Sequence, residues 1–184
     1  MVMAEATNHY FKHLGVSDGL SQVCIPSIYQ DELGAVWLGT TEGLNRYNGK
    51  DVKVFQPSES NHGLTNNEIN ELCGDKNGRM YIRSGNDLIK LDIYTEQFTC
   101  LRQKGVYGLF CKKDTLWVSC ADGIYYYTGQ GTELTFFARV QKGFVGRALY
   151  VDKETVWVVT RKYLVAISRE DPLRQEILLT LDKG

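Results

Sequence analysis

One short pattern occurs four times in this chain, and it constrains the fold more than any other feature. An aromatic residue opens an apolar triplet, and an aliphatic residue follows seven positions later, after a tight turn. The aromatic residues are Trp37, Tyr81, Trp117 and Trp157, and the aliphatic residues are Leu44, Leu88, Ile124 and Leu164. The aromatic residues lie 44, 36 and 40 positions apart. A constant core with connections of variable length is typical of stacked structural repeats, in which loops absorb the differences.

The first two copies align over a longer stretch, without a gap, at a spacing of 44 residues. Phe11 aligns with Phe55 and Asp31 with Asp75, and the alignment extends from residue 11 to residue 44. Chance would not preserve the register over so many positions. The pattern therefore marks a true internal repeat.

Each copy is predicted to form four short antiparallel strands. Asp31–Gly34 provides a turn, and Asn48-Gly49 favours a two-residue hairpin because both positions tolerate positive φ. No stretch shows a sustained 3.6-residue period, so we expect an all-β chain with almost no helix. A unit of this size is that of a propeller blade. The sequence thus predicts a single partial β-propeller domain over residues 1–184, with four consecutive four-stranded blades at approximately 24–56, 67–102, 106–140 and 146–182.

Residues 9–15 precede the first blade and align with the outer strand of the first repeat, so we expect them to form a spare outer strand. In a closed propeller the N-terminal strand often completes the last blade. Here the last blade already has its own outer strand, which predicts an open part of a larger ring. Its two end blades would expose broad apolar faces, and we expect a second copy to cover these faces in a homodimer.

Composition and charge exclude several classes of protein. The formal net charge is −1, and no more than two Lys or Arg residues are adjacent, so we expect no binding to nucleic acid. No apolar run approaches the roughly 18 to 20 residues that span a bilayer. Residues 1–4 lead directly into polar residues without a signal peptide, which fits a cytosolic protein or a chain cut downstream of its signal.

The five cysteines are an odd number without a CxxC spacing. Cys73 and Cys111 are predicted to occupy equivalent places at the end of a repeat's first strand. We interpret the cysteines as small buried hydrophobic residues, with a disulfide or a metal site as open alternatives.

Three further motifs indicate turns or strands rather than chemistry. Asp75–Gly78 resembles the start of a calcium loop, but the position of the bidentate Glu holds Asn86, so we interpret it as a turn. His9 and His13 lie four apart in a predicted strand, where they would be about 13 Å apart. Gly129–Gly131 lacks the third glycine and the helix of a dinucleotide loop. We therefore expect no cofactor, no metal and no catalytic residues.

The recurring aromatic residue is best interpreted as core, since a large ring fills the gap between neighbouring blades. Local function is expected where the copies differ, in the loops between the second and third strands of each blade. Propeller loops on this face usually receive ligands. The candidate ligand-binding residues are Thr41, Glu42, Arg83, Asn86, Asp122, Arg161 and Lys162.

The stretch from Phe11 to Gly49 contains Asp18-Gly19-Leu20-Ser21, then Tyr29-Gln30-Asp31 with Gly34, and then Trp37-Leu38-Gly39-Thr40 with Gly43-Leu44. It resembles the two-component regulator propeller repeat. The second copy replaces Gly-Thr by Arg83-Ser84, and the third and fourth copies keep little beyond the Trp and the turn.

This resemblance implies the N-terminal part of the periplasmic sensor region of a hybrid two-component system, a sensor histidine kinase and response regulator of glycan-using bacteria. It implies carbohydrate sensing, a propeller of about seven blades, an export signal, and a phosphorelay whose kinase lies outside this chain. The remaining blades and the kinase would be partners within the same polypeptide. The family has no universal binding motif in its blades, so no site residue is transferred.

Three functions remain open from the sequence. The first is a non-catalytic sensor module for an oligosaccharide. The second is a protein-interaction scaffold, which would show an exposed apolar patch without glycan binding. The third is a polysaccharide-active enzyme, which would need carboxylates, histidines or a metal at the central channel. The strands predicted to line the central channel are mostly uncharged, so the non-catalytic sensor module is favoured.

Overall fold

The structure is an open row of four β-sheets. The computed structural model describes residues 12–58, 63–140 and 145–180. Over these residues the chain forms sixteen strands and one turn of 3-10 helix, η1 (Val16–Asp18). Each sheet has four antiparallel strands in sequence order. The all-β prediction is therefore confirmed.

The strands follow the repeat. The first sheet contains β1 (Ser27–Gln30), β2 (Val36–Thr40), β3 (Gly43–Tyr47) and β4 (Val52–Phe55). The second contains β5 (Ile69–Gly74), β6 (Arg79–Ser84), β7 (Asp87–Asp92) and β8 (Gln97–Arg102). The third contains β9 (Val106–Lys112), β10 (Thr115–Cys120), β11 (Gly123–Tyr127) and β12 (Thr135–Ala138). The fourth contains β13 (Val145–Val151), β14 (Thr155–Thr160), β15 (Tyr163–Ser168) and β16 (Gln175–Thr180).

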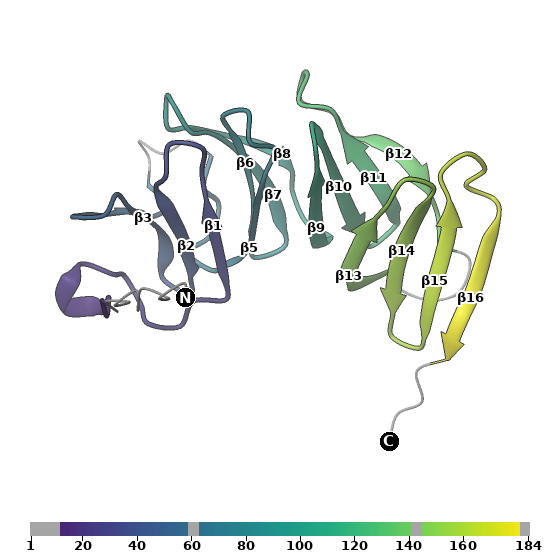
Figure 1. Cartoon of the computed structure of the whole chain (residues 1–184), viewed down its shortest axis with the longest axis horizontal. Helices are drawn as coiled ribbons and strands as arrows, with labels where there is room; N and C mark the ends of the chain where they lie inside the picture. The colour runs from purple at the N-terminus through teal and green to yellow at the C-terminus, as the bar shows by residue number, and fades with distance from the viewer. Residues whose placement is uncertain (1–11, 59–62, 141–144, 181–184) are drawn as a thin grey trace, which may run out of the picture.

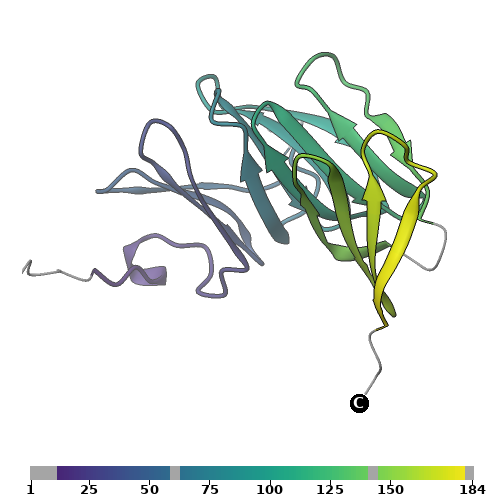
Figure 2. The ribbon, with the colours of Figure 1, turned by 45° about the vertical axis from the view of Figure 1, so that its right-hand side comes forward.

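The sheets stand side by side like propeller blades along an arc. Their first strands, β1, β5, β9 and β13, contact one another in that order. Figures 1 and 2 show the first and the fourth sheet at opposite ends of this arc, without contact between them. Four blades thus form an open arc, as the sequence predicts.

The predicted spare outer strand is wrong where the structure describes it. Residues 12–15 form no strand and lead into η1, while residues 9–11 lie outside the described residues. Gly15 and Asp18 instead build a local turn, in which the Asp18 carboxylate accepts a hydrogen bond from the Gly15 N–H at 2.9 Å. A turn-forming Gly and Asp compete here with strand pairing.

An aspartate organises the turn between β1 and β2. Asp31 Oδ1 accepts hydrogen bonds from the backbone N–H groups of Leu33 (3.0 Å) and Ala35 (2.9 Å). Its Oδ2 accepts one from Trp37 Nε1 at 2.8 Å. Gly34 completes the turn at φ 86°, where a side chain would be strained. One buried carboxylate therefore satisfies the turn and orients the repeat aromatic residue.

The second copy uses its aspartate in the same way. Asp75 Oδ1 accepts hydrogen bonds from the N–H groups of Asn77 (2.8 Å) and Arg79 (3.3 Å). The other carboxylate oxygen pairs with Arg79 Nε. These contacts support the interpretation of residues 75–78 as a turn.

Three of the four repeat aromatic residues are buried between sheets. Trp37 packs in a cluster from the first and second sheets, Tyr81 in one from the second and third, and Trp117 in one from the third and fourth. Trp37 and Tyr81 are fully buried and Trp117 is 5% exposed. Trp157 is half-buried, because no sheet of the described chain covers its face.

The hydrogen bonds of the Asp152 carboxylate, in the turn before β14, should make the stability of the fold depend on pH. It accepts hydrogen bonds from Trp157 Nε1 (2.7 Å) and from the N–H groups of Glu154 (2.9 Å) and Thr155 (2.8 Å). These hydrogen bonds hold the pKa of Asp152 below its ordinary value, and the bond from the indole N–H has the largest effect. Since the pKa of Asp152 is lower in the folded state, the ionised carboxylate stabilises the fold at pH values above its unfolded-state pKa of about 3.9. This stabilisation is lost as the pH falls through the folded-state pKa.

Trp157→Phe should raise this pKa toward the ordinary value, because the phenyl ring has no donor. A pH titration of the Asp152 carboxyl carbon by NMR measures the change. Arg161→Ala, at the other end of β14, is the control and should leave the pKa in place. An unchanged pKa in Trp157→Phe would show that the indole bond is not its main cause.

Candidate functional site

The loops predicted to carry function lie along one edge of the arc. Because each sheet is an antiparallel meander, its second and third strands join at the edge opposite the turn between the first two strands. These joints are the β2–β3, β6–β7, β10–β11 and β14–β15 loops, and they lie on the lower side in Figure 1. Each belongs to a different sheet, so the candidates form a row along a rim.

Six of the seven candidate residues are exposed on this rim. They are Thr41, Glu42, Asn86, Asp122, Arg161 and Lys162. Two of the loops are held by hydrogen bonds to their backbone carbonyls: the Gln56 side-chain amide donates to the Glu42 carbonyl at 2.8 Å, and the Val106 N–H donates to the Asn86 carbonyl at 3.0 Å. The side chains thus stand on ordered backbone.

Asp122 belongs to a small polar cluster on the rim. It pairs with Arg102 (2.8 Å) and accepts a hydrogen bond from the Tyr125 hydroxyl (2.8 Å), and Arg102 lies over the Tyr125 ring at 4.5 Å. Burial alone would raise the pKa of Asp122, but the Tyr125 and Arg102 hydrogen bonds lower it below the ordinary value. The carboxylate is therefore charged at neutral pH.

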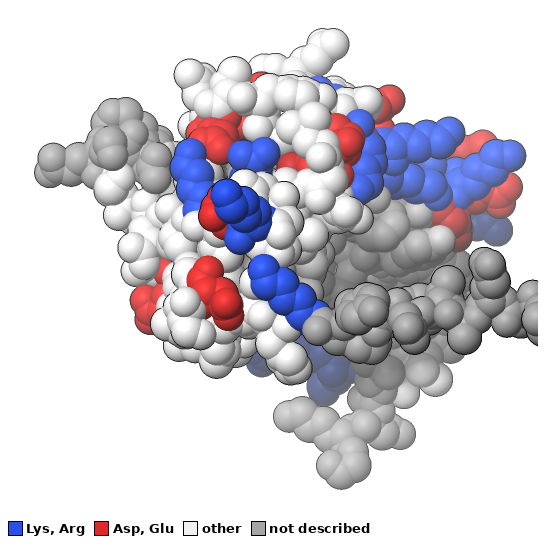
Figure 3. All heavy atoms as spheres, turned by 60° about the vertical axis from the view of Figure 1, so that its left-hand side comes forward, with Lys and Arg blue, Asp and Glu red and all other residues white. Residues whose placement is uncertain are grey.

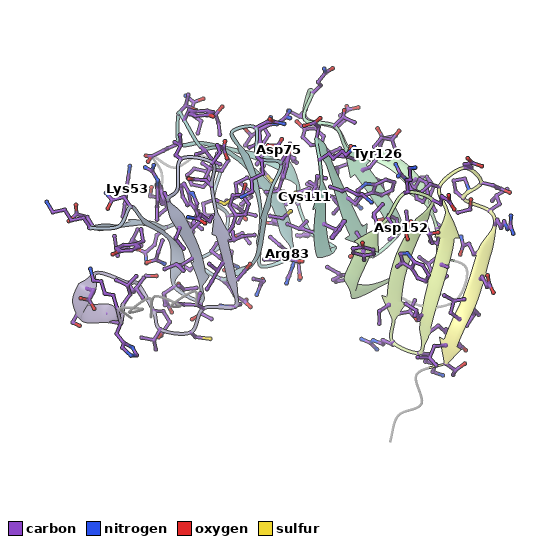
Figure 4. The ribbon with its side chains drawn as sticks, in the orientation of Figure 1. Lys53, Asp75, Arg83, Cys111, Tyr126 and Asp152 are labelled. Atoms are coloured by element: carbon purple, nitrogen blue, oxygen red, sulfur yellow. The ribbon has the colours of Figure 1, made fainter. Side chains whose placement is uncertain are left out.

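Arg83 lies within β6 rather than in a loop, which corrects its predicted place. Its side chain is 8% exposed and pairs with Glu71 at 3.4 Å. It also donates to Asn70 Oδ1 (3.2 Å) and to the Gly85 carbonyl (3.0 Å). Glu71 in turn accepts a hydrogen bond from the Leu109 N–H of β9 at 3.1 Å. This network joins the second sheet to the third (Figure 4).

The structure adds a feature that the sequence did not indicate, a basic hollow of about 310 Å³ at the opposite edge of the third and fourth sheets. It is lined by Lys112, Lys113, Asp114, Thr115, Trp117, Lys153 and Arg169. Arg169 lies over the Trp117 ring at 5.5 Å and donates to the carbonyls of Asp152 and Lys153, both at 3.0 Å. Lys112 donates to the Val151 carbonyl at 2.9 Å.

The hollow combines four cationic side chains with one carboxylate, so it suits an anionic group. Sequence reasoning missed it because its cations come from two blades. The available signal was that Lys112-Lys113 and Lys153 both stand near the turn between the first two strands of their blades. On the face shown in Figure 3, by contrast, basic and acidic side chains lie beside one another.

Within the described part of the chain, no group of three or more His, Cys, Asp or Glu residues is arranged to hold a metal ion. In the same residues, no helix has the length and apolar character needed to cross a bilayer.

Comparison with known families gives a match at the first repeat. Residues 19–42 match the family described as two component regulator propeller. This segment is similar to a two-component regulator propeller repeat. It includes the turn aspartate Asp31, the buried Trp37 and the Gly39-Thr40 pair.

Extracellular domains of putative hybrid two component systems are among the solved structures that are similar to this chain. The extracellular domain of the putative hybrid two component system BT3049 from B. thetaiotaomicron has a TM-score of 0.75 at 21% identity, over 91% of this chain and 26% of that chain. The corresponding domain of BT4673 has a TM-score of 0.63 at 21% identity, over 84% of this chain and 21% of that chain. These structures show the same propeller fold.

A curated relative is similar over a short stretch. Histidine kinase P4 of Formosa agariphila is 40% identical over 53 residues, which is 29% of this chain and 4% of that protein. This chain therefore spans about a quarter or less of each of these three proteins.

Proposed function

We propose that this chain is part of a non-catalytic periplasmic sensor module of a hybrid two-component signalling protein, and that it helps to recognise an oligosaccharide. The observation that carries the proposal is the two-component regulator propeller repeat at residues 19–42. Its support comes from the blade arrangement, which is similar to that of extracellular domains of putative hybrid two component systems. The kinase and the remaining blades would lie elsewhere in the same polypeptide.

The two edges of the arc offer different surfaces to such a ligand. The rim carries scattered polar side chains of both signs, while the basic hollow brings Lys112, Lys153 and Arg169 together beside the Trp117 ring. Carboxylate or sulfate groups pair with Lys and Arg. The hollow thus favours an acidic oligosaccharide over a neutral one.

Calorimetric titration of the purified chain with neutral and uronate-containing oligosaccharides tests the proposal. We expect the acidic set to bind and binding to weaken as salt rises, because exposed charges are screened. Lys153→Ala should weaken binding, whereas Lys162→Ala on the rim is the matched control. The reverse pattern would assign the ligand to the rim, and no binding by either set would count against a ligand-recognition role.

A protein-interaction scaffold is the second candidate, and the outward face of the fourth sheet favours it. Trp157 pairs with Ala166, and Val159 pairs with Leu164 on the same face. Leu164 is opposite Leu179, which is 53% exposed. Uncovered aliphatic and aromatic side chains on one sheet face form a surface suited to protein contact.

We propose that in the isolated 184-residue chain a second copy covers this face. Light scattering should then give about twice the monomer mass of 20.9 kDa, because burying the face removes apolar surface from water. Leu179→Asp should shift the equilibrium toward monomer, whereas Leu173→Asp, in the turn before β16, should not. A wild-type monomer at all concentrations would contradict the dimer.

A further inference from the structure

Two cysteines from neighbouring sheets face one another because their registers differ. In the second sheet, Cys73 of β5 is the cross-strand partner of Tyr81. In the third sheet, Cys111 of β9 is the partner of Leu116, whereas the residue opposite Trp117 is Phe110. The two cysteines are therefore one register position apart rather than equivalent, which corrects the interpretation from the sequence.

This difference turns their side chains toward the same interface. Successive residues of a strand point to opposite faces of a sheet. Cys73 shares a face with Tyr81, which contacts the Tyr127 ring of the third sheet. Cys111 shares a face with Leu116, which packs in the same cluster as Tyr81 and Leu88 of the second sheet. Both thiols thus point into the gap between these sheets.

The two sulfur atoms are 2.6 Å apart. Unbonded sulfur atoms lie much farther apart, and a disulfide bond is about 2.05 Å long. Figure 4 places Cys111 at the junction of the second and third sheets, beside the strands nearest the centre of the arc. Neither residue is exposed, and the other cysteines stand elsewhere: Cys24 is exposed and Cys120 is buried.

We propose that Cys73 and Cys111 form a disulfide that links the innermost strands of the second and third blades. The two thiols lose two protons and two electrons as the sulfur–sulfur bond forms. A disulfide of an oxidising protein or of glutathione accepts these electrons and leaves as two thiols, through a mixed disulfide. The persistence of the bond in the cell rests on the proposed periplasmic function, since that compartment is oxidising.

The surroundings of Cys73 suit a structural bond rather than a reactive thiol. Burial, and then the hydrogen bond with Cys111, raise the pKa of the Cys73 thiol well above its ordinary value. The thiolate is the form that attacks disulfides, so Cys73 reacts slowly once the sheets have packed. The bond therefore forms most readily during folding and resists exchange afterwards.

Such a bond would fix the angle between the second and third blades at the inner side of the arc, where their first strands meet. It closes a loop over a separation of 38 residues, which restricts the unfolded chain and stabilises the folded one. A ligand that acts through this arc would then move the second and third blades as one unit.

Mass spectrometry tests the bond directly. The reduced and denatured chain is refolded in a mixture of reduced and oxidised glutathione, then denatured and alkylated with iodoacetamide. With five cysteines in the chain, we expect three alkylated sites and a peptide that links Cys73 to Cys111. Reduction should restore alkylation at all five sites and lower the thermal midpoint by on the order of 5 to 15 °C. Alkylation of every site after oxidation, or a link between other cysteines, would overturn the proposal.

Matched variants separate this bond from the other thiols. Cys73→Ser with Cys111→Ser should abolish the redox dependence of the thermal midpoint, whereas Cys24→Ser with Cys100→Ser should retain it. This assay does not depend on ligand binding. If the purified chain forms the link but the protein is reduced in its native cell, the proposed location is wrong and the disulfide geometry stands.

Discussion

Replacing Trp37 by alanine is expected to lower the free energy of unfolding by about 3 to 5 kcal/mol, because it leaves a large cavity between the first two sheets. Trp37 is fully buried and stacks on Phe55 at 5.7 Å between ring centroids. The substitution also removes the indole donor to the buried Asp31 carboxylate. Far-UV circular dichroism in a urea series measures the loss without relying on tryptophan fluorescence.

Trp157→Ala is the matched control for this effect. Trp157 has the same place in its repeat and makes the same bond to a turn aspartate, at 2.7 Å. It differs in being half-buried at the uncovered face of the last sheet. Its replacement should therefore cost well under half as much. Equal losses for the two variants would show that burial between sheets is not what Trp37 contributes.

Arg83→Ala is expected to cost about 2 to 3 kcal/mol, because it breaks a largely buried ion pair and leaves polar partners unsatisfied. Glu71 is 29% exposed, so water compensates part of the loss. Arg83→Lys should recover only part of the stability, since an ammonium cannot reproduce the guanidinium fork. Thermal and urea unfolding of the three proteins measure these differences.

Arg161→Ala provides the comparison on the exposed rim. It should change stability by no more than about 0.5 kcal/mol, as is usual for surface substitutions. If Arg83→Ala instead leaves stability unchanged but weakens oligosaccharide binding, Arg83 is a binding residue. Loss of stability with unchanged binding assigns it to the junction of the second and third sheets.

The contrast between Gly39 and Arg83 shows why this residue was difficult to place. The two occupy the same position of the repeat, 44 residues apart. A Cβ atom on Gly39 would lie 2.8 Å from Ile69 Cγ2 and 3.0 Å from the Ile69 carbonyl, so the first two sheets leave no room there. Between the second and third sheets, the same position accommodates an arginine paired with Glu71. Sequence equivalence does not reveal this difference in spacing.

Features that depend on near neighbours along the chain could be predicted from its residues. The repeat length predicted the blades, and Asp31 and Asp75 predicted their turns, because a turn rests on contacts within a few residues. The wrong prediction at residues 12–15 was also local, since turn residues there outweighed the alignment with an outer strand.

The contacts between neighbouring blades could not be predicted in this way and became visible in the assembled fold. A shift of one residue in pairing turned Cys73 and Cys111 toward a shared interface, and the absence of a covering sheet in the described chain left Trp157 half-buried. The basic hollow likewise arises where turns of two blades meet. Contacts between sheets depend on register and on which sheet lies next, and a one-residue change in register reverses the face of every side chain.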